Sequence, residues 1–188
     1  MSNLNSGESN SRYKLNNVLW IEDQPEYLTG LLGCFGINNS IAAEFGLEMK
    51  HIISNVKHEV SPEKAMLEVE RLVSIAGDKP YILLFQTAQT ARTYLEQYLP
   101  AAIISDSNFP LNGKAVVGWL KAHGLSDYPL IGYSGKDLNE LDLEVQDFFS
   151  QTFARYFVKL KSNSKDIIDG VLFSRRYVEL LKNREGGL

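Results

Sequence analysis

Two patterns in the 188-residue sequence predict a doubly wound α/β fold, in which helices cover both faces of a parallel sheet. First, five short runs are apolar without alternating with polar residues, as expected of strands buried on both faces. Second, segments with helical periodicity separate these runs, so that strand and helix alternate along the chain.

The expected strands are the five apolar runs themselves. They are residues 17–21, 81–85, 101–104, 130–133 and 156–158. A first helix is expected to begin at Pro25, because proline suits the first turn of a helix. The other helices are expected where apolar residues recur every three or four positions. They are residues 87–99, 114–123, 137–153 and 164–183.

One region, residues 37–80, does not fit a simple repeat, and we interpret it as an insertion. It contains one clear helix over residues 61–76, with Ser61 as N-cap and Pro62 at the first helical position. We expect the apolar stripe of this helix to pack on the rest of the chain; the alternative is a recognition element whose stripe meets a partner or a second copy of the chain. Residues 47–56 fit either a strand or a helix, so an extra strand–helix unit is the competing interpretation.

Composition narrows the class of protein. The chain is 44% apolar and 22% charged, which excludes a mostly disordered chain, a coiled coil and a collagen-like repeat. Residues 1–16 are rich in Ser and Asn and are expected to be a disordered tail. The expected domain therefore spans residues 17–183, with the insertion at 37–80, and residues 184–188 form a second tail.

Charge and cysteine content indicate the compartment and exclude some partners. The net charge is −4 and no run of Lys or Arg is present, which argues against a nucleic-acid groove. No apolar run approaches the roughly 20 residues that span a bilayer, so no membrane association is expected. Cys34 is the only cysteine and cannot form an internal disulfide, so a cytoplasmic location is expected.

Polar residues follow four of the expected strands. Glu22 and Asp23 come after the first strand, Asp106 after the third, Ser134 after the fourth and Lys159 after the fifth. Ligands in open α/β sheets bind beyond the carboxyl ends of the strands, so these groups are expected to gather at one edge. Any one of them alone is better explained as a cap, turn or solvated residue, and only the joint pattern indicates a site.

Three carboxylates close together repel one another, and a divalent cation removes that cost. Hard oxygen ligands favour Mg²⁺ over Zn²⁺. A metal and the Lys159 ammonium could also spread the negative charge that a phosphoryl group adds, and Ser134 could donate to a phosphate oxygen. The chemistry that this set favours is phosphoryl transfer onto an aspartate.

The same segments resemble the receiver domain of two-component response regulators. They are residues 18–23, 103–110 with its Asp-x-x-x-Pro stretch, 129–135 and 156–159. The resemblance covers residues 17 to about 183, apart from the insertion. It implies a flavodoxin-like receiver fold, with five parallel strands in the order 2-1-3-4-5.

The resemblance implies a phosphoacceptor and a metal shell. Asp106 matches the phosphoacceptor and also a metal ligand. Asp23 matches the direct ligand to Mg²⁺, and Glu22 the acid that acts largely through metal-bound water. Asn108 matches the position whose backbone carbonyl completes the shell.

It also implies a switch. Ser134 matches the hydroxyl that hydrogen-bonds the phosphoryl group, and Lys159 the lysine that pairs with it. Tyr156 matches the aromatic residue that turns inward on activation, and Lys136 a position that tunes dephosphorylation. Leu160 departs from the family, which usually has proline after this lysine, so the loop after the last strand is expected to differ.

The resulting hypothesis is a stand-alone receiver, and not an enzyme beyond its own phosphorylation and dephosphorylation. Its expected partners are a histidine kinase or histidine phosphotransfer protein and a downstream protein target. A homodimer through the family's fourth helix, fifth strand and fifth helix is a further expectation. The alternative is a pseudo-receiver, a binding module that is never phosphorylated. A related metal-dependent phosphatase would need a second acid where Asn108 stands.

Overall fold

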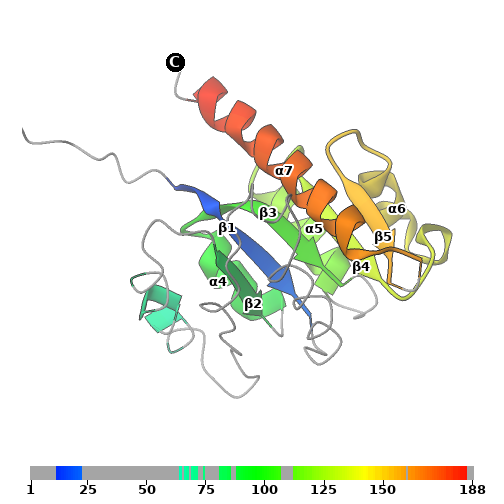
Figure 1. Ribbon diagram of the computed structural model, residues 1–188, viewed down its shortest axis with the longest axis horizontal. Helices are drawn as coiled ribbons and strands as arrows, with labels where there is room; N and C mark the ends of the chain where they lie inside the picture. The colour runs from blue at the N-terminus through cyan, green and yellow to red at the C-terminus, as the bar shows by residue number, and fades with distance from the viewer. Residues whose placement is uncertain are drawn as a thin grey trace, which may run out of the picture.

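The computed structural model describes residues 12–22, 81–85, 88–106, 112–159 and 161–185, with scattered positions between 64 and 74. The described strands form one all-parallel sheet in the order β2-β1-β3-β4-β5. The strands are β1 Tyr13–Ile21, β2 Tyr81–Phe85, β3 Leu99–Ser105, β4 Leu130–Ser134 and β5 Arg155–Val158. The predicted α/β fold and strand order are therefore confirmed (Figure 1).

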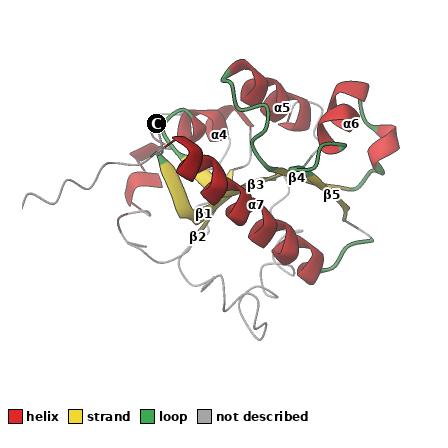
Figure 2. Ribbon diagram, turned by 90° about the horizontal axis from the view of Figure 1, so that it is seen from above, coloured by secondary structure: helices red, strands yellow, loops and turns green. Residues whose placement is uncertain are grey.

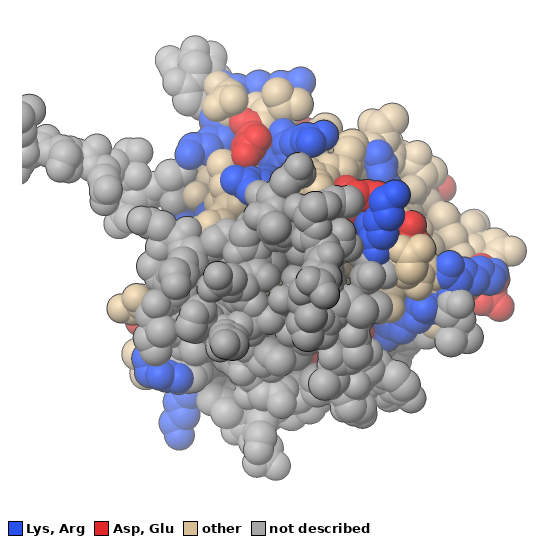
Figure 3. Space-filling view, viewed as in Figure 1, with Lys and Arg blue, Asp and Glu red and all other residues tan. Residues whose placement is uncertain are grey.

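The described helices cover both faces of this sheet. They are α4 Ala88–Leu95, α5 Asn112–Ala122, α6 Leu143–Phe149 and α7 Ser164–Glu185, with a 3₁₀ turn η2 over Leu138–Glu140. Figure 2 shows α4, α5 and α6 on one side of the sheet and α7 running across the other. The outer side of α7 carries both signs of charge, as the face drawn in Figure 3 shows.

The core lies where the central strands are buried on both faces. Every residue of β3 and β4 is buried, as is the second half of β1. Burying each large apolar side chain contributes about 2 kcal/mol, which is why these strands show no alternation. Trp20 and Leu19 on β1 are fully buried, although they point to opposite faces of the sheet.

The expected N-terminal tail is too long, because Tyr13 to Asn16 belong to β1. A hydrogen bond and the burial of one side chain hold this first part of the strand. The Leu99 N–H donates to the carbonyl of Arg12 at 2.7 Å, and Tyr13 is only 8% exposed. The pairing of β1 with β3 shifts register between Lys14 and Val18, so the early residues do not continue the apolar run that marked the strand.

Two expected helices are shorter than predicted. α4 stops at Leu95, and Leu99 and Pro100 already belong to β3. The expected helix over 137–153 is instead two pieces, η2 and α6. Leu141 between them is extended (φ −90°, ψ 167°), and Asp137 and Asp142 each occupy an N-cap position. An acidic residue before each apolar cluster thus starts a helix anew instead of lying within one.

Only part of the interpretation of residues 37–80 falls on described residues. The described positions between Lys64 and Ser74 are helical. Met66 and Val69 are 6% and 0% exposed and belong to the main core, so the apolar stripe at these positions packs on the chain itself, as expected. The ambiguous stretch at 47–56 and the first helix at Pro25 lie outside the described residues.

Candidate functional site

The carboxyl ends of β1, β3, β4 and β5 bring four of the predicted site residues to one edge. Backbone hydrogen bonds continue the sheet just past each strand and fix where these residues lie. The Glu22 N–H donates to the Phe85 carbonyl at 2.9 Å, and the Asp106 N–H to the Ile21 carbonyl at 3.0 Å. The Lys159 N–H donates to the Ser134 carbonyl at 2.7 Å.

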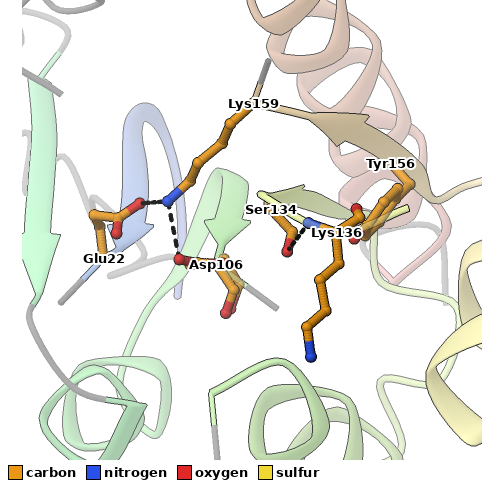
Figure 4. Close-up of polar contacts among 7 residues, drawn as sticks. Glu22, Asp106, Ser134, Lys136, Tyr156 and Lys159 are labelled. Carbon is orange, nitrogen blue, oxygen red and sulfur yellow. Dashed lines mark hydrogen bonds and ion pairs between the residues drawn. The ribbon is translucent and has the colours of Figure 1, made fainter. Parts of the chain in front are cut away.

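Lys159 joins two buried carboxylates. Its ammonium donates to Glu22 Oε2 at 2.7 Å and to Asp106 Oδ2 at 2.9 Å, as the dashed lines of Figure 4 show. The exposed fractions of the three side chains are 0% for Glu22, 6% for Asp106 and 19% for Lys159. Three residues far apart in the sequence therefore form one compact ionic cluster, which we call the edge triad.

The pKa of Lys159 reflects both its burial and its partners. Burial alone would lower this pKa, but the hydrogen bonds and charges of Glu22 and Asp106 outweigh burial and raise it above the usual value. The ammonium therefore stays charged at neutral pH. With both acids ionised, one cation faces two anions within the edge triad.

Ser134 and Tyr156 are linked through the loop that follows β4. The Ser134 hydroxyl is fully buried and accepts a hydrogen bond from the Lys136 N–H at 3.3 Å. The Lys136 carbonyl in turn accepts from the Tyr156 hydroxyl at 2.8 Å. A change in the hydrogen bonding of Ser134 would therefore reach Tyr156 through the backbone of one residue (Figure 4).

The Tyr156 ring occupies a place that only glycine leaves open. A Cβ on Gly132 would lie 2.5 Å from Cδ2 of Tyr156 and 2.7 Å from Cζ of Phe149. The rings of Tyr156 and Phe149 meet edge to face, with centroids 5.2 Å apart. Gly132 thus allows the aromatic ring to lie close against β4.

The loop after β5 is closed by a turn and by a surface ion pair. The N–H groups of Lys161 and Ser162 both donate to the Val158 carbonyl at 2.9 Å. The Lys161 ammonium binds both carboxylate oxygens of Asp137, at 2.6 and 2.9 Å. Leu160 stands where the receiver domains that the sequence resembles usually have proline, and it lies outside the described residues; no described peptide bond is cis.

Two predicted metal ligands, Asp23 and Asn108, lie outside the described residues. Among the residues that are described, no group of three His, Cys, Asp or Glu side chains could hold a metal. The donors that are in place, Glu22 and Asp106, are adjacent carboxylates of the kind that Mg²⁺ prefers. Glu22 and Asp106 are thus the two predicted ligands that the described residues bring together, and the Mg²⁺ site itself stays a prediction.

Tyr133 and Trp20 contribute a part of the site that sequence reasoning missed. The Lys159 ammonium lies over the Tyr133 ring, 5.6 Å from its centroid, and Tyr133 meets Trp20 edge to face at 5.8 Å and 84°. Burial, despite the nearby Lys159, raises the pKa of Tyr133, so its phenol stays neutral. Both residues sit inside apolar runs, where nothing in the sequence separates them from ordinary core.

Comparisons with known proteins add no relatives. No family model matches the sequence, and no curated protein and no solved structure matches it. Within the described part of the chain, none of the helices is long and apolar enough to cross a membrane. Function must therefore be inferred from the residues at the carboxyl edge of the sheet.

Proposed function

We propose that this chain is a receiver domain that accepts a phosphoryl group on Asp106 from a histidine kinase or a histidine phosphotransfer protein. The observation that carries the proposal is the edge triad, in which Lys159 reaches from the end of β5 to Asp106 and Glu22. A lysine shared by two buried carboxylates is costly to build, because each desolvated charge loses hydration. In a phosphoacceptor site the lysine would stabilise the negative charge that develops on the phosphoryl oxygens during the reaction.

The reaction exchanges one bond to phosphorus for another. A carboxylate oxygen of Asp106 attacks phosphorus, and the bond from phosphorus to the donor's imidazole nitrogen breaks. The electron pair of that bond stays on the imidazole, which takes up a proton. Hydrolysis later transfers the phosphoryl group to water, releases inorganic phosphate and restores the carboxylate. The chain assists only these two steps on its own side chain.

Lys159 and Ser134 are suited to receive the product. The ammonium already lies 2.9 Å from Asp106 Oδ2, so it can pair with a phosphoryl oxygen after a small shift. Ser134 is at the end of the neighbouring strand β4 and has a hydroxyl that can donate to a second oxygen. Positioning and charge stabilisation supply most of the catalysis in phosphoryl transfer.

Mg²⁺ would be held by Glu22 and Asp106 together with the predicted ligands Asp23 and Asn108. When bound, it would neutralise part of the acidic charge and stabilise the negative charge on the phosphoryl oxygens. The Lys159 ammonium pairs with both described carboxylates and would share their negative charge with the metal.

Signalling would use the route from Ser134 to Tyr156. A phosphoryl group that draws the Ser134 hydroxyl toward it would compete with the Lys136 N–H, whose carbonyl holds Tyr156. Such a change shifts a population only if the two arrangements bind the phosphoryl group unequally. The surface formed by α6, β5 and α7 would then meet the downstream protein or a second copy of the chain.

Mass spectrometry after incubation with acetyl phosphate and Mg²⁺ tests the proposal. The wild-type chain should gain one acid-stable, base-labile acyl phosphate, and Asp106→Asn should gain none. Asp147→Asn, an exposed substitution on α6, is the matched control and should behave as wild type. Fluoroberyllate, a mimic of the phosphoryl group, should bind the wild type but not Asp106→Asn.

A pseudo-receiver is the second candidate, and one observation favours it. Lys159 already pairs with one oxygen of each carboxylate, so the edge triad can also serve as a purely structural ion cluster. Failure of the wild type to take up phosphate or fluoroberyllate, with Mg²⁺ present and the fold intact, would reject the first function and leave the pseudo-receiver as the remaining candidate.

A further inference from the structure

The ammonium of Lys159 has a third neighbour besides its two carboxylates. It lies over the ring of Tyr133, on β4, at 5.6 Å from the centroid. We infer that Tyr133 is a positioning residue for Lys159, holding its ammonium beside Asp106 at the place where a phosphoryl group would arrive. The inference relies on the proposed function for what Lys159 does there, but the contact itself can be tested separately.

The path of the lysine explains why such a support is useful. Lys159 follows β5, whereas its partners Asp106 and Glu22 follow β3 and β1. In the order β1-β3-β4-β5, its side chain must pass over the end of β4 to reach them. A lysine stem is long and flexible, so carboxylates alone leave its course undetermined. Tyr133, the penultimate residue of β4, lies under that crossing.

The ring is itself held firmly. Tyr133 is 5% exposed, and its ring meets the fully buried ring of Trp20 edge to face. Trp20 is on β1, two residues before Glu22, so the same strand supports both the ring and one carboxylate of the edge triad. Aromatic faces attract cations within about 6 Å of the ring centroid, and more strongly where water is excluded.

As a consequence, the Lys159 ammonium can exchange one hydrogen-bond acceptor for another while it stays over the Tyr133 ring. When an anion replaces one carboxylate oxygen, the ammonium can turn its N–H groups toward it and remain over the ring. If Tyr133 were only a core residue, any side chain of similar volume would serve. If Tyr133 positions Lys159, an aromatic replacement should preserve the position of the ammonium and an aliphatic one should not. If Tyr133 is only a core residue, the two replacements should have the same effect.

Three variants separate these cases. Tyr133→Phe keeps the ring, and Tyr133→Leu removes it; Tyr133→Met is a second aliphatic variant, should the leucine variant fold poorly. The first readout is the NMR shift of the Lys159 ε-methylene group, observed with ¹³C-labelled lysine and assigned with Lys159→Arg. The second is affinity for fluoroberyllate in the presence of Mg²⁺.

In the wild type and in Tyr133→Phe, the ring should move the ε-methylene protons upfield of those of exposed lysines. The aliphatic variants should lose this shift and bind fluoroberyllate roughly 2- to 30-fold more weakly, while Tyr133→Phe stays within about twofold of wild type. An unshifted methylene group in the wild type, or equal affinities for the phenylalanine and aliphatic variants, would overturn the inference. If the wild type binds no fluoroberyllate, the proposed function fails, and the methylene shift alone decides the role of Tyr133.

Discussion

The amino ends of the parallel strands form one edge of the sheet, and their carboxyl ends form the other. Both edges bury polar side chains, but with different chemistry. At the amino edge, two of the buried groups are phenols, each with a partner. Tyr128 is fully buried and its hydroxyl donates to the Pro100 carbonyl, while Tyr13 hydrogen-bonds Glu185. At the carboxyl edge, two carboxylates share one ammonium, and the three groups follow three different strands.

The comparison contrasts a buried polar group that one hydrogen bond satisfies with a buried cluster of charged groups. Burial raises the pKa of Tyr128 well above its usual value, so this phenol stays neutral and needs only one acceptor. The hydrogen bond from Tyr128 to Pro100 connects the segment before β4 to the start of β3. At the carboxyl edge, two buried carboxylates share the Lys159 ammonium, and under the proposed function this ion cluster receives a phosphoryl group.

The largest effect is expected when the shared cation is removed from the carboxyl edge. Lys159→Met should slow phosphate uptake from acetyl phosphate by about 100-fold, because one stabiliser of the developing charge is lost. It should also lower the free energy of unfolding by about 3 kcal/mol, since two buried carboxylates lose their partner. Quantitative mass spectrometry and urea unfolding measure the two effects.

Lys165→Met, an exposed substitution on α7, is the control and should change neither quantity. Uptake at the wild-type rate in Lys159→Met would show that Lys159 takes no part in phosphoryl transfer and that the edge triad is structural.

The next largest effect is expected on the affinity for Mg²⁺. With Trp119→Phe as background, Trp20 is the only tryptophan, and Mg²⁺ should quench its fluorescence as the charges near β1 rearrange. Glu22→Gln in the same background should weaken Mg²⁺ binding by about 10-fold, the usual cost of losing an outer-shell acid. Titration with Na⁺ at matched ionic strength should leave the fluorescence unchanged. Equal Mg²⁺ affinity with Glu22 and with Gln at this position would remove Glu22 from the metal site.

A smaller effect is expected at the amino edge, and on stability alone. Tyr128→Phe removes the hydroxyl that donates to Pro100 and should lower the free energy of unfolding by about 1 kcal/mol. Phosphate uptake should stay at the wild-type rate, because the substitution lies at the opposite edge from Asp106. The comparison between the edges would break down if Tyr128→Phe slowed uptake while the fold remained stable.

The smallest effect is expected at the ion pair between Lys161 and Asp137, whose side chains are 65% and 49% exposed. Lys161→Ala should change the free energy of unfolding by about 0.5 kcal/mol or less, and added salt should reduce even that. Uptake should fall less than twofold. A large loss of uptake would mean that this pair, and not the edge triad, fixes the loop that carries Lys159.

The apolar runs were enough to predict a parallel sheet and four positions at its carboxyl edge, and the resemblance to receiver domains supplied the strand order. Buried parallel strands leave uninterrupted apolar runs, and the residue after each run has only one edge to occupy. The sequence was not enough for the ends of elements. Tyr13 joins β1 through long-range contacts with Glu185 and with the start of β3, and no local pattern records such contacts.

Side-chain geometry at the site was also beyond the sequence. The resemblance paired Lys159 with a phosphoryl group, whereas the structure pairs it with Glu22 and Asp106. Tyr133 looks like any other apolar residue of its strand until the ammonium is placed over its ring. The predicted roles of Asp23 and Asn108 stay predictions, because both residues lie outside the described part of the chain.

The hydrogen bond between Tyr13 and Glu185 has a practical consequence for experiments. It places the start of β1 and the end of α7 together at the amino edge, while Asp106 is at the other edge (Figure 1). A fluorophore, affinity tag or tether joined before residue 12 or after residue 185 would therefore begin on the far side of the sheet from Asp106. Immobilising the chain by either end should leave Asp106 and α6 open to capture partners from solution.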